Sequence, residues 1–579
     1  MFVLPGCQQN SRPERIVIKI IETTDVHGAI FPYDLISDQA TQHSLAQVYS
    51  YVEQQRNQTG QEVILLDNGD ILQGDPLIYY YNFERNDEPH IVSQVMNFMK
   101  YDAATVGNHD IEPGPAVYNK VLNEFNFPWM AANAVDQKTK ESFFKPYTII
   151  ERQGVRIAVL GLITPAIPKW LPEYTWEGLE FQDMIEAANL WVEKIQQNEK
   201  PDLLIGLFHA GVDYTYANQD ENTRFNENAS LLIAEQVPGF DVIFVGHDHH
   251  GWNKWASDFF GSEVLILGAL NGARNVAVAN ITLTLDKSTN SYTKEITGEI
   301  VVTDPFEPHQ AFMSLFRPAF DNATDYVVRP IGELTTTLST RPVFFGDAAF
   351  TDLIHQVQLD LTGADISFAS SNSFDLEIKP GVLLVRDMFT FHRYENLLYT
   401  MTLTGQEIKD YLEYSAGLWF NQMTSSSDHL LLMKKDENGN ILLRKNNTAS
   451  LQNPFWNLDA AEGIIYTVDV SMPVGARIKI SKMVNGEPFE LQKIYKVAVN
   501  SYRGNGGGDH LTVGAGIPVE ELNARIVFST EKDLRWHTVE WIEKKGAISP
   551  VSNSNWKVVP EKWVMEAWQK DQLLLFGGK

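Results

Sequence analysis

The sequence predicts a layered α/β protein, with a second mixed α/β unit in its C-terminal half. From residue 16 to about residue 300, short apolar runs rich in β-branched residues alternate with segments that have helical spacing. The lengths of these runs favour strands, and segment 183–198 has the spacing of a helix. The predicted strands are 16–21, 62–67, 156–164, 202–208, 241–246 and 263–270.

The chain has 579 residues, which is too long for a single hydrophobic core. We predict a leader remnant or tail at 1–15, a first domain at 16–303, a linker helix at 304–335 and a second domain at 336–579. The second domain combines predicted helices with predicted strands, and it is long enough to form a core of its own.

The charge of the chain restricts its partners. There are 74 acidic and 46 basic residues, and the formal net charge is −28. Such a balance argues against binding of a nucleic-acid polymer or of an anionic membrane surface. It is compatible with small anionic substrates, because bound metal ions can reverse the local field. No apolar run approaches the roughly 20 residues that a membrane-spanning helix needs.

Cys7 is the one cysteine of the chain, so an internal disulfide framework is ruled out. It follows the stretch "MFVLPG", which resembles the end of a bacterial lipoprotein signal, although a basic n-region is missing and Pro5 departs from the pattern. Two interpretations stay open. Either Cys7 is a lipid anchor on a periplasmic or cell-surface protein, or it is a chance cysteine near the start of the sequence.

Metal-ligand residue types follow five apolar runs of the first domain, four of the predicted strands and the short run "AATV" at 103–106. In open α/β sheets, ligands bind beyond the carboxyl ends of the strands. One such residue alone would be read as a buried core histidine or a turn residue. Five runs that end in this way form a pattern, and it predicts a metal site. The residues are Asp25, His27, Asp70, Asn108, His209, His247 and His249.

Imidazole nitrogens with carboxylate and amide oxygens suit Mn, Zn, Fe or Co. Seven candidates are too many for one tetrahedral ion, so we predict two divalent ions that share a carboxylate. Other residues of these types belong to no such set and are interpreted as structural. These are Asp67, Asp75, His43, His90, His250 and His392.

In this order, the motifs D-x-H, G-D, G-N-H-D, a His after a strand, and G-H-x-H resemble those of the calcineurin-like metallophosphoesterases. The stretches "GDPLIYY" and "FNENASLLI" resemble the secreted nucleotidase branch of that family. Residues 389–413, 457–478 and 495–511 look like the substrate domain of bacterial 2′,3′-cyclic-nucleotide 2′-phosphodiesterase/3′-nucleotidases. The resemblance implies a β-sandwich flanked by helices, followed by a nucleotide-binding α/β domain.

The resemblance also implies roles for single residues. One ion would be held by Asp25, His27, Asp70 and His249, and the other by Asp70, Asn108, His209 and His247. His109 would donate a proton to the leaving group, and Glu112 stands where many relatives have an Asp that orients this histidine. In the second domain, Tyr394 and Tyr502 would sandwich the base, and Asn396 would support the base-binding loop. Gly506, Gly507 and Gly508 would let the backbone approach a ligand.

For these second-domain residues, core packing of the tyrosines and a plain glycine loop are the alternatives. The implied function is hydrolysis of nucleotide phosphoesters by a monomer in the periplasm or at the cell surface. Two alternatives remain: a 5′-nucleotidase or nucleotide-sugar hydrolase, and a non-catalytic surface binding protein. The 5′ branch usually has an N-G-G-x-R stretch, whereas residues 370–381 have Asn372 but neither the glycine pair nor the Arg. This favours cyclic and 3′-nucleotides as substrates.

Overall fold

The computed structural model describes residues 12–216 and 219–577. Cys7 and most of the predicted leader lie outside the described residues, and Arg15 already begins the first strand. The chain divides into two compact units, the first of which ends at Tyr326. The second unit begins at Val327 and also contains the short segment Lys169–Pro172. Each unit is described by itself below.

The first unit contains two six-stranded sheets. In both sheets the central strands run parallel and antiparallel strands close one or both edges. One sheet has the order β16 (Ser291–Val302), β15 (Asn275–Asp286), β1 (Arg15–Thr23), β4 (Glu62–Asp67), β5 (Ala103–Thr105) and β6 (Trp129–Met130). The other has the order β13 (Trp252–Ser257), β14 (Glu263–Gly268), β12 (Val242–Val245), β11 (Leu203–His209), β9 (Val155–Ile163) and β8 (Tyr147–Arg152).

The two sheets form a sandwich around one shared apolar core. Ile18 and Ile20, which alternate along β1, belong to one buried cluster. The same cluster contains Leu203, Ile205 and Leu207, which alternate along β11 in the other sheet. Because successive side chains of a strand point to opposite faces, the outer faces of both sheets are left for helices to cover.

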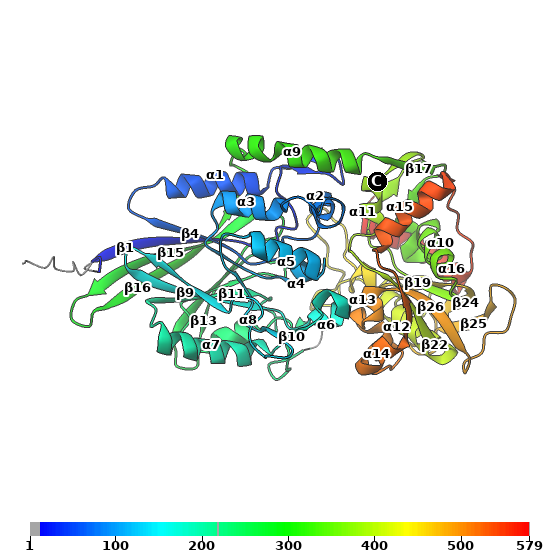
Figure 1. Ribbon diagram of the computed structural model, residues 1–579. Helices are drawn as coiled ribbons and strands as arrows, with labels where there is room; N and C mark the ends of the chain where they lie inside the picture. The colour runs from blue at the N-terminus through cyan, green and yellow to red at the C-terminus, as the bar shows by residue number, and fades with distance from the viewer. Residues whose placement is uncertain (1–11, 217–218, 578–579) are drawn as a thin grey trace, which may run out of the picture. The chain divides into compact units, whose positions relative to one another are not determined.

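Helices cover these outer faces, so the unit has four layers (Figure 1). On the second sheet, α7 (Met184–Asn198) and α8 (Ser230–Gln236) pack against residues of β9, β11 and β12. On the first sheet lie α1 (Leu45–Arg56) and α3 (Ile91–Met99) (Figure 1). The layered α/β fold predicted for this unit, with a sandwich flanked by helices, is confirmed.

Helix α7 illustrates how the sequence sets these elements. Asp183 caps its N-terminus by accepting hydrogen bonds from the amides of Ile185 and Glu186, at 2.9 and 3.1 Å. Its buried residues include Ala188, Val192 and Ile195, which recur at intervals of three and four. The observed bounds differ by one residue from the predicted helix at 183–198, because Asp183 is the cap.

The predicted linker at 304–335 contains a helix only over α9 (Gln310–Val327). The rings of Phe312 and Phe316 on this helix lie 6.2 and 5.5 Å from that of Phe98 on α3, so the helix packs on the first unit. The last part of the predicted linker is β17 (Pro330–Leu334), a strand of the second unit. The predicted linker is therefore divided between the two units. Helix α9 has an apolar face that packs on the first unit, whereas a free linker would have no core to cover.

The second unit is built on a five-stranded sheet. Its order is β23 (Ala460–Glu462), β19 (Ile366–Ala369), β26 (Ile494–Asn500), β22 (Leu398–Thr404) and β27 (Ile526–Ser529). Two three-stranded sheets accompany it. One has the order β21 (Gly381–Leu384), β17 and β28 (Ala547–Ile548). The other has the order β25 (Ile478–Met483), β24 (Ile464–Asp469) and β29 (Trp556–Val559). The main helices are α10 (Ala349–Thr362), α11 (Val385–Phe391), α12 (Gly405–Trp419), α15 (Leu534–Lys545) and α16 (Glu561–Phe576).

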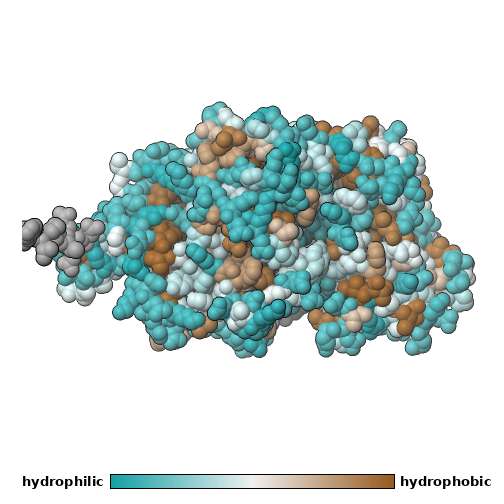
Figure 2. Space-filling view, viewed as in Figure 1, coloured by the Kyte–Doolittle hydropathy of each residue, from teal (hydrophilic) through white to brown (hydrophobic). Residues whose placement is uncertain are grey.

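The surface visible in Figure 2 is mainly hydrophilic, with separate hydrophobic spots. Among the helices of the described residues, none is long and apolar enough to cross a membrane.

Candidate active site

The seven residues predicted as metal ligands lie together at the carboxyl ends of strands in the first unit. Asp25 and His27 follow β1, Asp70 follows β4 and Asn108 follows β5. His209 ends β11, and His247 and His249 follow β12. Six of the seven form two groups in which potential ligand atoms lie within 4.8 Å of one another. The groups are Asp25 with His27 and His249, and Asp70 with His209 and His247.

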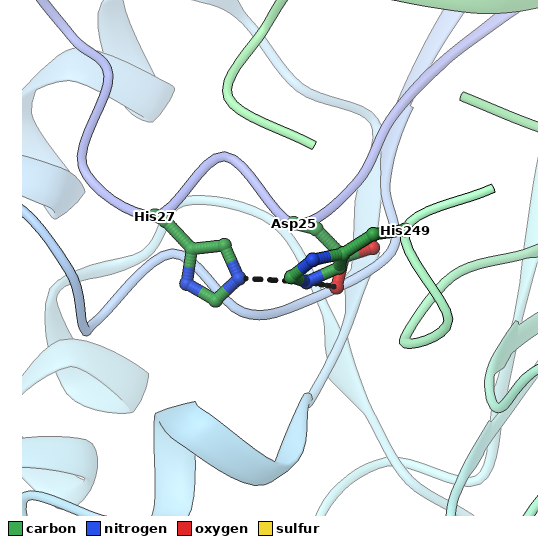
Figure 3. Close-up of side chains that lie close together, drawn as sticks. All are labelled: Asp25, His27 and His249. Carbon is green, nitrogen blue, oxygen red and sulfur yellow. Dashed lines mark hydrogen bonds and ion pairs between the residues drawn. The ribbon is translucent and has the colours of Figure 1, made fainter. Parts of the chain in front are cut away.

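In the first group, three side chains converge on one point (Figure 3). The Nε2 atoms of His27 and His249 lie 3.1 Å apart, and His249 Nε2 lies 3.3 Å from Asp25 Oδ1. His27 Nδ1 lies 3.2 Å from the carbonyl oxygen of Gln73 and donates to it. This hydrogen bond keeps the proton of a neutral His27 on Nδ1 and leaves a lone pair on Nε2, as a metal ligand requires.

The second group has the same design. His209 Nδ1 lies 2.6 Å from the carbonyl oxygen of Asn68, to which it donates. His209 Nε2 lies 3.1 Å from Asp70 Oδ2 and 3.1 Å from Asn108 Oδ1. Asn108 thus joins this group through its amide oxygen. Two oxygens and one nitrogen with lone pairs meet in a buried place, and a cation satisfies all three at once.

Protonation of the first group suits metal binding. Burial lowers the pKa of His27 to about 4, so its ring is neutral at pH 7. Burial by itself raises the pKa of Asp25, but the hydrogen bond from His249 and the charges of His209 and His249 lower it to about 2. Asp25 is therefore ionised. Neutral imidazole and ionised carboxylate are the forms that bind a divalent ion.

In the second group, burial and the charge of Asp70 act on the pKa of His209 in opposite directions. Burial by itself lowers the pKa of His209, but the charge of Asp70 raises it to about 10. The pair therefore holds a proton at pH 7, and a metal ion would displace it.

Five of the seven residues have a backbone conformation that is uncommon for residues other than glycine. The φ angles are 48° at Asp25, 48° at His27, 60° at Asp70, 75° at His247 and 57° at His249. Backbone hydrogen bonds between the loops hold this geometry, from Asp25 to Gly69 at 2.9 Å and from His27 to Asp70 at 2.9 Å. Left-handed residues concentrated at one place indicate a functional site.

Two glycines of the motifs allow these loops to approach one another. A Cβ atom on Gly107 would lie 2.2 Å from Asp70 Oδ1, and one on Gly246 would lie 2.1 Å from Thr24 Oγ1. Any other residue would push the ligand-bearing loops apart.

Asp110 is a site residue that the sequence pattern did not single out. Its carboxylate accepts hydrogen bonds from the amides of Asp70, Ile71 and Leu72, each at 3.0 Å, and from Gly107 at 2.8 Å. It thus fixes the turn that presents Asp70. Its place directly after His109 in "GNHD" is the only signal in the sequence, and that signal does not reveal the contacts.

His109 lies beside the groups, and its side chain is 22% exposed. Its amide donates to Asp70 Oδ1 at 2.8 Å, and its ring Nδ1 lies 2.5 Å from Glu112 Oε2. Glu112 therefore reaches the ring although it is longer than the Asp of many relatives. With Nδ1 bound to Glu112, Nε2 is the nitrogen that can exchange a proton with a substrate.

Four of the six residues interpreted as structural have contacts of that kind. Asp75 caps a short helix, and His90 caps α3 while its ring bonds Asn82 at 2.9 Å. The ring of His392 bonds Thr538 at 2.9 Å. Asp67 accepts from Thr23 Oγ1 at 2.6 Å and so joins the ends of β1 and β4.

In the second unit, Asn396 connects the segments that carry the two predicted base-stacking tyrosines. Its Oδ1 accepts from the amide of Tyr502 at 3.2 Å and from Ser501 Oγ at 3.3 Å. Tyr394 and Tyr502 are both half-buried. Tyr394 and Asn396 line a small pocket together with Asn372 and His392.

The glycine run after Tyr502 packs against protein atoms. A Cβ atom on Gly507 would lie 2.5 Å from the ring of Tyr502, and one on Gly508 would lie 2.1 Å from Arg503 Nη1. Arg503 in turn donates to the carbonyl of Gly507 at 2.7 Å and pairs with buried Asp459. Close packing of the loop on Tyr502 and Arg503 is therefore sufficient reason for Gly507 and Gly508, without a ligand.

Comparison with known families identifies both units. Residues 18–251 match the calcineurin-like phosphoesterase family, and residues 330–513 match the C-terminal domain of the 5′-nucleotidases. The chain therefore belongs to the calcineurin-like metallophosphoesterases that carry a 5′-nucleotidase C-terminal domain, and it is a hydrolase of the nucleotidase family.

Three relatives show the range of names in this family. The chain is 25% identical to a trifunctional nucleotide phosphoesterase of Bacillus subtilis over 95% of its own length, but it spans only 39% of that relative. It is 25% identical to a 2′,3′-cyclic-nucleotide 2′-phosphodiesterase/3′-nucleotidase of Salmonella typhimurium, covering 94% of this chain and 89% of the relative. The chain is also 25% identical to a 5′-nucleotidase of Vibrio cholerae, over 71% of this chain and 79% of the relative.

Solved structures share the fold. A Staphylococcus aureus protein crystallised with alpha-ketoglutarate has a TM-score of 0.75 at 20% identity, and covers 94% of this chain and 99% of its own. A 5′-nucleotidase precursor from Thermus thermophilus has a TM-score of 0.61 at 18% identity, and the match covers 94% of this chain and 100% of that chain.

Asp70 provides a test of the two groups. Asp70→Asn should abolish tight binding of both ions, because this carboxylate is the one predicted to bridge them. Metal content after dialysis, measured by mass spectrometry, checks this expectation. Asp87→Asn, at an exposed aspartate of the same unit, is the matched control and should retain both ions. Tight binding of two ions by the Asp70 variant would contradict the shared-ligand arrangement.

Proposed function

We propose that the chain hydrolyses 2′,3′-cyclic nucleotides to 3′-nucleotides, and then 3′-nucleotides to nucleosides and phosphate. The observation that carries the hydrolytic part is the convergence of the seven ligand side chains beside the His109–Glu112 pair. The relative of Salmonella typhimurium supports the choice of substrate, because the match extends over 89% of that protein.

The side chains of the first unit would divide the work. Asp25, His27, Asp70 and His249 would hold one divalent ion, and Asp70, Asn108, His209 and His247 the other. Mn, Zn, Fe and Co all suit this donor set. Two such ions, when bound, make water a nucleophile near neutral pH and stabilise negative charge on phosphoryl oxygens.

His109 would complete the reaction on the leaving side. Water adds to phosphorus, the bond to the ribose oxygen breaks, and that oxygen takes a proton from His109 Nε2. Glu112 holds His109 by its Nδ1, at 2.5 Å, and so directs the other nitrogen to this task. For a cyclic substrate the bond to O2′ breaks first and the 3′-phosphate remains, and a second hydrolysis then releases phosphate.

The second unit would bind the base. Tyr394 and Tyr502 offer aromatic rings, and stacking on a ring contributes about 1–3 kcal/mol per base. Asn396 joins the two tyrosine segments by its hydrogen bonds to Ser501 and Tyr502. Such a contact is tolerant of base identity, because every base has a π-face.

Asp375 would give a second reason to expect cyclic and 3′-nucleotides only if its carboxylate were unpaired. Asp375 stands near the place where the 5′ branch has its Arg, and an unpaired carboxylate would repel a 5′-phosphate. Arg341, however, donates to both oxygens of Asp375, at 2.5 and 3.2 Å. The charge of Asp375 is compensated, and what remains is the lack of an Arg within 370–381. A 5′-nucleotidase is therefore the second candidate, and the Vibrio cholerae relative supports it.

We also propose that the protein acts as a monomer in the periplasm or at the cell surface. The lipoprotein-like stretch that ends at Cys7 supports this location. A complete ligand set with a paired His109 favours an enzyme over a surface protein that only binds nucleotides.

Substrate comparison tests the proposal. Catalytic efficiency on 2′,3′-cyclic AMP and 3′-AMP should exceed that on 5′-AMP at least tenfold, about 1.4 kcal/mol or more in transition-state stabilisation. Phosphate release, with phosphatase added for the cyclic substrate, measures all three. A preference for 5′-AMP would replace the proposed substrate class and leave the metal chemistry in place.

His109→Asn should lower turnover on 3′-AMP by about 10²–10⁴ while both ions stay bound, because His109 acts as an acid and not as a ligand. The loss should be smaller on p-nitrophenyl phosphate, whose leaving group needs less protonation. Metal content and steady-state kinetics check the two parts. Loss of a metal ion from this variant would show that the histidine has another role.

Tyr394→Ala and Tyr502→Ala should each raise the Michaelis constant for nucleotides, since about 1–3 kcal/mol of stacking is lost. Hydrolysis of p-nitrophenyl phosphate, which has no base, should change little. The Phe variants keep the ring and serve as controls. Equal losses on both substrates would show that the tyrosines serve packing and not the base.

A further inference from the structure

A carboxylate outside the predicted ligand set meets one of the ligand histidines in the first unit. Glu227 Oε1 lies 3.1 Å from His247 Nε2, and each of the two side chains is 13% exposed. Glu227 lies within "FNENASLLI", on the segment that leads into α8, and it is 20 residues from His247 along the chain. Neither the motif spacing nor the strand-end pattern indicates this contact.

The contact determines which nitrogen of His247 can bind a metal ion. A carboxylate only accepts hydrogen bonds, so His247 Nε2 carries the proton and donates it to Glu227. Nδ1 is then the nitrogen with a lone pair. We propose that Glu227 is a positioning residue for the second metal ion, holding His247 in the tautomer and ring orientation that binding requires. This inference rests on the proposed two-metal site.

Two other candidate ligand histidines, His27 and His209, each have one ring nitrogen bound to a protein acceptor, as His247 does. His27 donates to the carbonyl of Gln73, and His209 donates to the carbonyl of Asn68. Each ring is thus fixed through the nitrogen that does not face the site. Glu227 does the same for His247 through a side-chain oxygen.

Glu227 sits on a rigid support. Its amide donates to Gln219 Oε1 at 3.1 Å, and its carbonyl accepts from Thr164 Oγ1 at 3.0 Å. The flanking Asn226 donates to the carbonyl of Tyr214 at 2.9 Å, and Asn228 accepts from the amide of Gly211 at 3.1 Å. These contacts fix the backbone of Glu227, from which its carboxylate reaches His247.

The backbone contacts of His247 do not set the orientation of its ring. Its amide donates to both oxygens of Asp25, at 3.2 and 3.0 Å, and its φ is 75°. These contacts place the Cα atom, but rotation about the side-chain bonds is left to the contacts of the ring.

Metal titration of the apoprotein tests the proposal. Protein stripped with a chelator is titrated with Mn²⁺ in a calorimeter, and the wild type should take up two ions. Glu227→Ala should lower the affinity for one ion about 10–100-fold and leave the other unchanged. Glu227→Asp, which is one methylene too short, should show a loss of the same kind. Glu227→Gln keeps an oxygen acceptor at the same reach and should bind within about threefold of wild type.

Glu235→Ala, at an exposed carboxylate of the neighbouring α8, is the matched control and should bind both ions as the wild type does. Thermal unfolding of the apoproteins shows whether each variant folds, and the Asp variant replaces the Ala variant if the latter does not. Unchanged affinities in the Ala and Asp variants would overturn the role. Equal losses in the Ala and Gln variants would overturn it too, because an oxygen acceptor at the same reach would then not be enough to position His247. A wild type that binds fewer than two ions would instead refute the two-metal site.

Discussion

The buried carboxylate of Asp70 is the group on which the site depends. Its Oδ1 accepts from the amide of His109, and its Oδ2 lies 3.1 Å from His209 Nε2. Its own amide is held by Asp110, and its loop lies against Gly107. A buried carboxylate is costly unless positive charge lies beside it. His209 lies beside it, and the charge of Asp70 raises the pKa of His209 to about 10 although burial lowers it. A divalent ion would supply more charge, so the arrangement favours a metal over a proton.

The sandwich makes this concentration of polar groups possible. Parallel strands of both sheets end at one edge of the unit, and β1, β4, β5, β11 and β12 each supply one or two side chains there. The core between the sheets is apolar and tightly packed, so the strand ends are fixed in position. The site therefore takes its precision from the packing of Ile, Val and Leu side chains, and only its chemistry from the loops.

The sequence predicted the fold and the clustering of the candidate ligands because both follow from local patterns. The apolar runs that became β1, β4, β11 and β12 were visible from their length and composition, and the ligand residues followed each run directly. Asp110 and Glu227 were not predicted, since their partners are far away in the sequence and no period connects them. The pairing of Arg341 with Asp375 was missed for the same reason. Gly507 and Gly508 carried an ambiguous signal, because close packing on Tyr502 and Arg503 and close approach of a ligand select the same residue.

The left-handed backbone at five ligand positions has a consequence for the stability of the loops that carry them. Each of these residues would relax if it were replaced by glycine, which adopts a positive φ without steric cost. The strain at such positions is of order 1–3 kcal/mol each. The five candidate ligands therefore carry a conformational cost at the place where the loops meet. The contacts between the loops, such as those from the amide of His247 to Asp25 and from the amide of His109 to Asp70, must offset that cost for the site to keep its shape.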